Sequence, residues 1–272
     1  MGVMRVLIPE QLSDPRSQAA APVDVHAHYA AGWADRTGMR VNFISSADGG
    51  ATAGGLSRGL QTPGDNAVFA ALRDLADVIV VGAATAQAEG YRPASPSPER
   101  TQIRQRYGFQ PAPAIAVLSS SLNLNLDSEL YRRARPDAPT MIITGSAAPI
   151  SARNDVIDLA GSDAAVQLLE APADGNGGVD LAAAIRHLLD IGYRRILCEG
   201  GPRLFGSAVA AGVVTELCLS VSPMLVGPGA PRIVAGEQWE GEQPTLTLAG
   251  LLSEDDALFC RYLVGSAVGK HP

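Results

Sequence analysis

The sequence predicts a single α/β domain built on a mostly parallel sheet with helices on both faces. Short apolar runs alternate with segments of helical periodicity along most of the 272 residues, and this alternation is typical of parallel strands joined by helical crossovers. The run Val78–Val81 is apolar throughout, as expected for a strand buried on both faces. No linker or internal repeat divides the chain, so we expect an N-terminal arm over 1–39 and one domain over 40–272.

The first half of this domain has a well-marked helix start. Residues 40–46 are predicted to form a strand, and the glycine-rich segment 47–60 a loop. Thr62 and Pro63 then begin a helix, because threonine caps a helix N-terminus and proline suits the first helical position. Apolar residues recur behind it with helical spacing, at Val68, Leu72 and Leu75.

Shorter patterns predict the remaining elements. The proline-rich, charged segment 93–113 is expected to be a surface loop. The tail 245–263 has two apolar stretches on either side of a polar turn, which favours an antiparallel hairpin. Between them we expect strands at 114–118, 140–143, 194–199 and 216–221, and helices at 181–189 and from Pro202 to about Ala211.

Composition excludes several classes of function. The net charge of −7 argues against a broad electrostatic grip on nucleic acid. No apolar run is long enough for a membrane span, and the N-terminal apolar stretch, Val6 to Ile8 before Pro9, is too short for a secretory signal. The three cysteines are widely spaced in apolar runs, which favours buried, reduced thiols and a cytoplasmic protein. His26 and His28 lie two residues apart without the acids or cysteines that would complete a metal site, so we expect no metal.

Four predicted strand ends carry small residues where a ligand would bind. They are the segments Gly82–Thr85, Ser119–Ser121, Thr144–Ser146 and Glu199–Pro202. Ligands of open parallel sheets bind at the carboxyl ends of the strands, and free N–H groups at a helix start, here near Pro202, favour a phosphate. Together these ends suggest a dinucleotide, although neither the Rossmann fingerprint nor a P-loop is present. Any one of them alone could be a plain turn.

The order and spacing of several stretches resemble the reductase domain of riboflavin biosynthesis, a pyrimidine reductase family with a dihydrofolate-reductase-like fold. The resemblance covers roughly residues 40–263. It rests on Ser46-Ala47-Asp48-Gly49, on Thr62-Pro63 with Leu72-Arg73, on the segment 77–85 with Glu89, and on Glu199-Gly200-Gly201-Pro202.

This resemblance implies NADPH as hydride donor, a small-molecule substrate and a homodimer. Ser57, Arg73 and Glu199 would face the substrate, and Arg73 could hold a phosphate through parallel hydrogen bonds or simply lie on the helix surface. Cofactor contacts are implied at Ile44, Gly82, Ala83, Thr85, Ser119, Ser120, Thr144, Gly200, Gly201, Pro202, Arg203 and Leu204.

The implied reaction adds hydride to a C=N bond, which must also gain a proton. Asp48 and Glu89 are the candidate acids, although Asp48 could instead be a turn aspartate before Gly49. Glu89 occupies a position where the family usually has aspartate, Gly50 replaces a basic residue, and no deaminase module is present. We therefore expect a reductase of a phosphoribosylamino-pyrimidine, in the manner of 5-amino-6-(5-phosphoribosylamino)uracil reductase. A dihydrofolate or other pterin reductase, or a non-catalytic nucleotide-binding protein, remains open.

Overall fold

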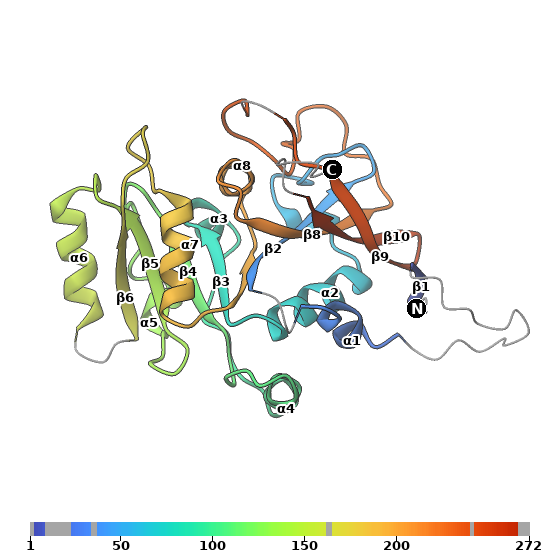
Figure 1. The fold of residues 1–272 in the computed structure, drawn as a ribbon, viewed down its shortest axis with the longest axis horizontal. Coiled ribbons are helices and arrows are strands. Elements are labelled where there is room, and N and C mark those ends of the chain that lie inside the picture. The colour runs from blue at the N-terminus through green and yellow to red at the C-terminus, as the bar shows by residue number, and fades with distance from the viewer. Residues whose placement is uncertain (1–2, 9–22, 34–36, 162–164, 240–241, 266–272) are drawn as a thin grey trace, which may run out of the picture.

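The computed structural model describes residues 3–8, 23–33, 37–161, 165–239 and 242–265. Within these residues ten strands form one sheet in the order β1-β9-β10-β8-β2-β7-β3-β4-β5-β6 (Figure 1). The strands from β8 to β6 run parallel, and β10, β9 and β1 continue the sheet antiparallel. The mostly parallel sheet and the C-terminal hairpin expected from the sequence are confirmed.

The strands follow the apolar runs closely. The parallel set consists of β2 (Gly38–Ser46), β3 (Val78–Gly82), β4 (Ala114–Leu118), β5 (Thr140–Gly145), β6 (Val166–Ala171), β7 (Arg195–Cys198) and β8 (Val214–Ser222). The antiparallel set consists of β1 (Arg5–Ile8), β9 (Leu246–Glu254) and β10 (Ala257–Val264). All residues of β5 are buried, in keeping with a sheet covered on both faces.

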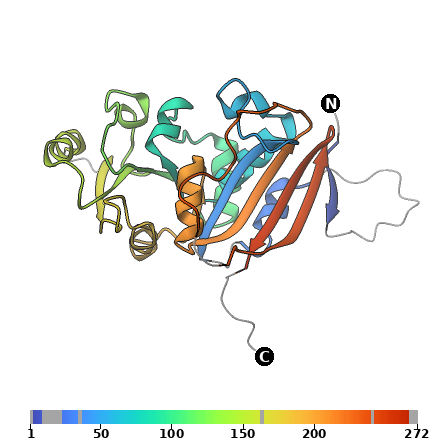
Figure 2. The same cartoon turned by 90° about the horizontal axis from the view of Figure 1, so that it is seen from above.

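Helices cover both faces of the sheet, as predicted (Figures 1 and 2). On one face α7 (Leu181–Asp190) and α8 (Pro202–Ala210) pack against alternate residues of the parallel strands. The other face carries α1 (Val25–Ala30) and α2 (Pro63–Asp74), and farther along the sheet α3 (Ala83–Ala88), α5 (Glu129–Arg132) and α6 (Ile150–Ala160). The predicted cap is also confirmed, since the Thr62 side chain accepts a hydrogen bond from the Asp65 N–H and Pro63 is the first helical residue.

The segment 93–113 is not the plain surface loop that the sequence predicted, because it contains α4 (Pro98–Arg106). Ser97 caps this helix and Pro98 opens it. The helix has no apolar stripe. It is held instead by Arg104, a buried arginine that donates hydrogen bonds to the carbonyls of Arg73, Asp74 and Ala76. Helical periodicity cannot reveal such an attachment.

The described residues that precede β2 pack on the rest of the chain. Residues of β1 pair with β9, and α1 lies against α2. His26 contacts the Asp74 carboxylate at 3.1 Å, so it does not pair with His28. Among the described residues no group of ligands suited to a metal ion occurs, none of the helices is long and apolar enough to span a membrane, and the three cysteines are buried and unpaired.

Candidate active site

The strand ends singled out in the sequence lie side by side. In the sheet β7 is flanked by β2 and β3, and β4 and β5 follow in parallel. The chain after β7 contacts the chain after β3 directly, because the Gly82 N–H donates to the Gly200 carbonyl at 2.7 Å. A Cβ atom on Gly201 would lie 2.4 Å from Thr85 Oγ1, so a side chain there would displace the Thr85 hydroxyl. Gly82, Gly200 and Gly201 thus form an edge without side chains, the glycine edge. A phosphate group of a ligand could approach the main chain closely there.

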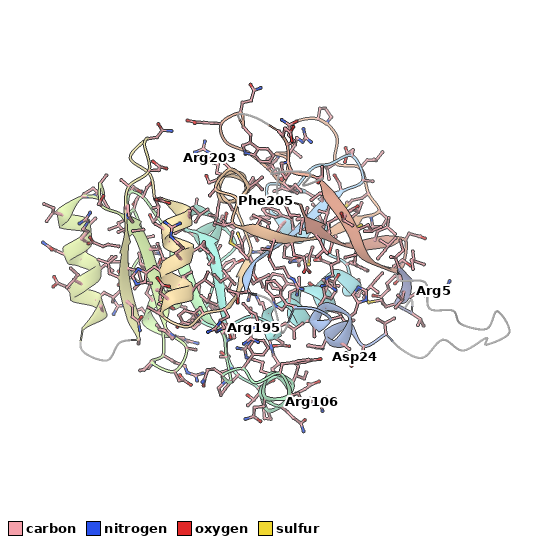
Figure 3. The ribbon with its side chains drawn as sticks, viewed as in Figure 1. Arg5, Asp24, Arg106, Arg195, Arg203 and Phe205 are labelled. Carbon is pink, nitrogen blue, oxygen red and sulfur yellow. The ribbon has the colours of Figure 1, made fainter. Side chains whose placement is uncertain are left out.

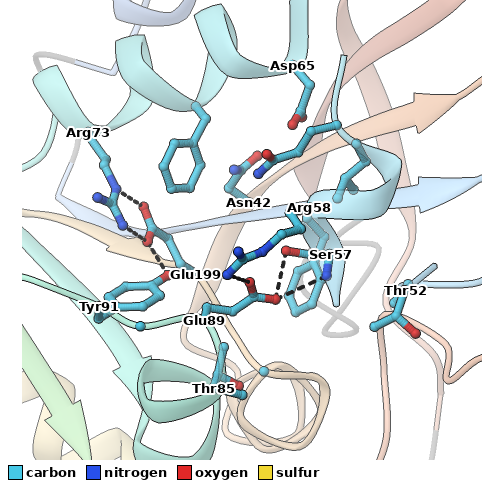
Figure 4. Close-up of a pocket in the computed structure, with 18 of the residues that line it drawn as sticks. Asn42, Thr52, Ser57, Arg58, Asp65, Arg73, Thr85, Glu89, Tyr91 and Glu199 are labelled. Atoms are coloured by element: carbon cyan, nitrogen blue, oxygen red, sulfur yellow. Dashed lines mark hydrogen bonds and ion pairs between the residues drawn. The ribbon is translucent and has the colours of Figure 1, made fainter. Parts of the chain in front are cut away.

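A cavity of about 880 Å³ opens beside this edge (Figure 4). Its walls come from β2, from the loop and the 3-10 helix Ser57–Leu60 that precede α2, from α2 itself, from α3 and the segment after it, and from the turn after β7. That volume suits a small-molecule site. Eight of the residues predicted from the sequence line it: Ile44, Ser57, Arg73, Thr85, Glu89, Glu199, Gly201 and Pro202.

Glu199 and Arg73 form the most strongly bound pair in the cavity. Arg73 Nε and Nη2 donate to the two carboxylate oxygens at 2.7 and 2.6 Å, and the Tyr91 hydroxyl donates to Glu199 Oε2 at 2.5 Å. The guanidinium also lies 4.3 Å from the ring centroid of Phe69. Burial opposes the charge of Arg73, but the Glu199 carboxylate outweighs it and raises the arginine pKa. Burial, together with that same carboxylate, raises the pKa of Tyr91 well above 10.

Glu89 also lines the cavity and is held by Ser57. Its Oε1 accepts hydrogen bonds from the Ser57 N–H at 3.0 Å and from the Ser57 hydroxyl at 2.9 Å. Arg58 Nη2 is 3.9 Å from Oε2, and the Arg58 side chain is 61% exposed. The second carboxylate oxygen of Glu89 is therefore only loosely engaged and faces the cavity (Figure 4).

Asp48, the other candidate acid, lies outside this cavity. Its carboxylate accepts hydrogen bonds from the Ser46 hydroxyl at 2.5 Å and from the N–H groups of Val226 and Gly227 at 3.2 and 2.8 Å. The Ser46 bond first, and then these two, lower the pKa of Asp48. Asp48 thus fastens the turn after β2 to the chain after β8, as a turn aspartate would.

The remaining cofactor positions lie around the cavity rather than in its wall. Gly82, Ala83 and Gly200 belong to the glycine edge. Ser119 is buried and accepts from the Leu122 N–H, whereas Ser120 is exposed. Thr144 is buried, and its Oγ1 has no hydrogen-bond partner. On α8, Leu204 is buried in the core and Arg203 lies on the exposed side, while Phe205 stacks on Phe43 (Figure 3).

Sequence reasoning missed several polar residues of the cavity, among them Asn42, Arg58, Asp65 and Tyr91. Tyr91 follows α3 by three residues and reaches Glu199 only because β3 and β7 are neighbours. Asn42 lies within a strand, between the apolar residues Val41 and Phe43. Asp65 follows Thr62 and Pro63 in the first turn of a capped helix, where an acid is expected for helix stability alone. A polar residue within a buried strand was the one available signal.

Comparison with known proteins agrees with this geometry. A relative from Archaeoglobus fulgidus, named 2,5-diamino-6-ribosylamino-4(3H)-pyrimidinone 5′-phosphate reductase, is 27% identical over 169 residues, which make up 62% of this chain and 72% of the relative. The crystal structure of a pyrimidine reductase-like protein from Corynebacterium diphtheriae is 29% identical, with a TM-score of 0.72 and coverage of 84% of this chain and 92% of that one.

RibD from Acinetobacter baumannii shares the fold, with a TM-score of 0.62 at 18% identity over 85% of this chain and 59% of that one. The family model of the RibD C-terminal domain matches residues 38–257, which contain the whole cavity and the glycine edge beside it. The resemblance noted in the sequence is confirmed, and the chain belongs to the RibD C-terminal domain family.

Proposed function

We propose that this protein is an NADPH-dependent reductase of a phosphoribosylamino-pyrimidine in riboflavin biosynthesis. The observation that carries the proposal is the placement of Glu199, Arg73 and Glu89 in one cavity directly beside the glycine edge. Such a cavity can hold a flat, polar ring against a cofactor that lies along the edge. The named activity of the archaeal relative supports the same assignment.

The cofactor fits the residues present. The turn at Gly200 and Gly201 leaves no room for side chains, and α8 begins there with a proline, so the N–H groups that follow can face a pyrophosphate. Thr85 and Ile44 line the cavity next to this turn and would flank the nicotinamide. Ser119, Ser120 and Thr144 follow in sheet order toward the adenosine end. NADPH, when bound, supplies the hydride and leaves as NADP⁺.

The chain's own task is to orient the substrate and deliver one proton. The open-chain form of a ribosylamino group has a C=N bond, whose carbon takes the hydride while its nitrogen takes the proton. Of the two candidate acids, the placement favours Glu89, because it lines the cavity and one of its carboxylate oxygens is only loosely engaged. The Asp48 carboxylate is hydrogen-bonded outside the cavity. Glu89 would take a proton from water and pass it to the nitrogen.

Arg73 is a weaker candidate for the phosphate than its exposed neighbours, because its Nε and Nη2 already donate to Glu199, whose carboxylate balances its charge. We assign to it the positioning of Glu199 and Tyr91. Among the arginines that line the cavity, Arg92 pairs with Glu129 and Arg100 with Asp74 at 2.8 Å each. Arg58 has only its 3.9 Å contact with Glu89 and is the most available for a phosphate.

The proposal is tested by following NADPH oxidation at increasing concentrations of the pyrimidinone ribosylamino phosphate, with NADH and dihydrofolate compared in parallel. We expect turnover that requires the pyrimidine and prefers NADPH. Faster reduction of dihydrofolate would assign a pterin reductase instead, and cofactor binding without turnover of either substrate would indicate a non-catalytic protein.

We also infer that the enzyme is a cytoplasmic homodimer. Buried, unpaired cysteines suit a reducing compartment. Leu246 and Leu248 are 47% and 36% exposed on the same face of β9, and apolar residues gathered on a strand face favour association. Light scattering of the purified protein at several concentrations measures the mass directly, and a monomer throughout would contradict the dimer.

A further inference from the structure

Three acids line the cavity within the described residues, and one of them is not used by the mechanism above. Glu199 is saturated by Arg73 and Tyr91, and Glu89 is held by Ser57. Asp65 is 4% exposed, and no cation of the described chain forms an ion pair with it. Burial raises its pKa, because the charged form is desolvated without a counter-charge, and a hydrogen bond from the Ser220 side chain offsets part of that rise. A buried acid without a cation, open to a cavity, favours a ligand that donates hydrogen bonds.

Asn42 places a second acceptor at the same end of the cavity. It lies on β2 and lines the cavity, and its Oδ1 is buried with no hydrogen-bond partner. In Figure 4 the Asp65 carboxylate points from α2 into the cavity on the side where Asn42 lies, away from the pair formed by Arg73 and Glu199. Buried acceptors are rarely left unpaired in a folded protein. Asn42 Oδ1 thus lacks a donor, and Asp65, which has Ser220 beside it but no cation, adds a second acceptor group to the same end of the cavity.

The position of Asp65 is fixed by its helix. Thr62 caps the first turn of α2 by accepting from the Asp65 N–H at 3.2 Å. The preceding residue, Gly64, lies so close to β10 that a Cβ atom there would be 2.5 Å from Phe259 Cζ. The start of the helix therefore cannot shift without repacking, and the carboxylate is held ready for a ligand, which reduces the cost of binding.

We propose that Asp65 and Asn42 recognise the donor edge of a 2-amino-4(3H)-pyrimidinone and make the enzyme selective for it over the corresponding uracil. This inference rests on the proposed reductase function and names its substrate class. In a 2-amino-4(3H)-pyrimidinone the exocyclic amine and N3–H are adjacent donors, which a carboxylate can accept together. A uracil has a carbonyl at position 2, so it would place an acceptor against two acceptors.

The first test compares kcat/KM for the 2-amino and 2-oxo ribosylamino phosphates. We expect the wild-type protein to prefer the 2-amino substrate by at least about 10-fold, as for the loss of one buried hydrogen bond. Asp65→Asn keeps the shape but offers an amide donor, so the preference should shrink to within about threefold or reverse. Asn42→Leu, which removes the second acceptor, should weaken the preference in the same direction. Asp155→Asn, an exposed acid on α6, is the matched control and should leave the ratio unchanged.

The second test separates failure of this inference from failure of the proposed function. Calorimetric titration of the two nucleotides into cofactor-free protein measures recognition without turnover. If neither compound is reduced, the reductase assignment fails, and the titration still decides whether Asp65 selects the 2-amino edge. Equal affinity for the two nucleotides, or a preference that survives Asp65→Asn in a variant that melts like the wild type, would overturn the inference.

Discussion

Glu89 is the residue whose chemistry the proposed reaction needs most directly. Glu89→Gln preserves the hydrogen bonds from Ser57 but removes the group that can carry a proton. We expect kcat to fall by about 100-fold or more, the usual contribution of a general acid, with little change in KM for the pyrimidine. Steady-state kinetics of the variant measure both constants. Glu99→Gln, on the exposed side of α4, serves as control, and a kcat within threefold of wild type would remove Glu89 from the proton path.

Substitution of Arg73 measures how much the stability of the protein depends on pairing the buried Glu199 carboxylate with a cation. The Glu199 side chain is 2% exposed and that of Arg73 19%, so Arg73→Met leaves a nearly buried carboxylate without its cation. We expect a loss of about 3 kcal/mol in the free energy of unfolding. Much of that loss should be recovered when Glu199→Gln is added, because the double variant buries no unpaired charge.

Urea unfolding measures these differences. Arg92→Met breaks the exposed pair with Glu129 and should cost less than about 1 kcal/mol. Equal losses in the two arginine variants would mean that the buried pair contributes no more than a surface pair does.

At the scale of elements, the turn between β7 and α8 joins the cavity to the glycine edge, along which we propose that the cofactor lies. Gly201→Ala would place a Cβ atom 2.4 Å from Thr85 Oγ1, which displaces the Thr85 hydroxyl and adds a methyl group where the pyrophosphate is proposed to lie. We expect the dissociation constant for NADPH to rise by about 10-fold, as for the loss of one or two amide contacts. Fluorescence titration of NADPH measures it. Gly175→Ala, at a position where a Cβ meets open space, should bind as wild type does, and tight binding by Gly201→Ala would place the pyrophosphate elsewhere.

Elements held by apolar burial could be predicted from the sequence, and elements held by polar contacts could not. The runs of β3 and β4 are apolar from end to end, and the cap of α2 is a local signal, so all three were found. Helix α4 depends on the buried Arg104 and its bonds to distant carbonyls, which leave no period in the chain. The same distinction holds for the site. The glycine turns could be recognised from residues adjacent in the sequence, whereas Tyr91 contacts Glu199 only because β3 and β7 are neighbours in the sheet.

Across the whole molecule, negative charge prevails, but positively charged side chains gather at the cavity. The net charge is −7, yet four arginines line the cavity, at positions 58, 73, 92 and 100. Ion pairs with acids take up most of this positive charge. The acidic surface would repel a phosphorylated substrate at long range, so the phosphate must be attracted by the charge that remains at the cavity, which is that of Arg58.

Arg58→Ala should therefore weaken binding of the phosphorylated substrate specifically. The Arg58 side chain is 61% exposed and 3.9 Å from its nearest acid, so its loss should disturb the fold little. We expect KM for the 5′-phosphate to rise by about 10-fold, as for one charge-assisted hydrogen bond, while KM for the dephosphorylated nucleoside stays the same. Salt should reduce the difference between the two substrates in the wild type, because an exposed guanidinium is screened. Arg92→Ala, which removes a cavity arginine that is already paired with Glu129, is the matched control. An equal rise of KM for both substrates in Arg58→Ala would show that this arginine shapes the cavity and does not bind the phosphate.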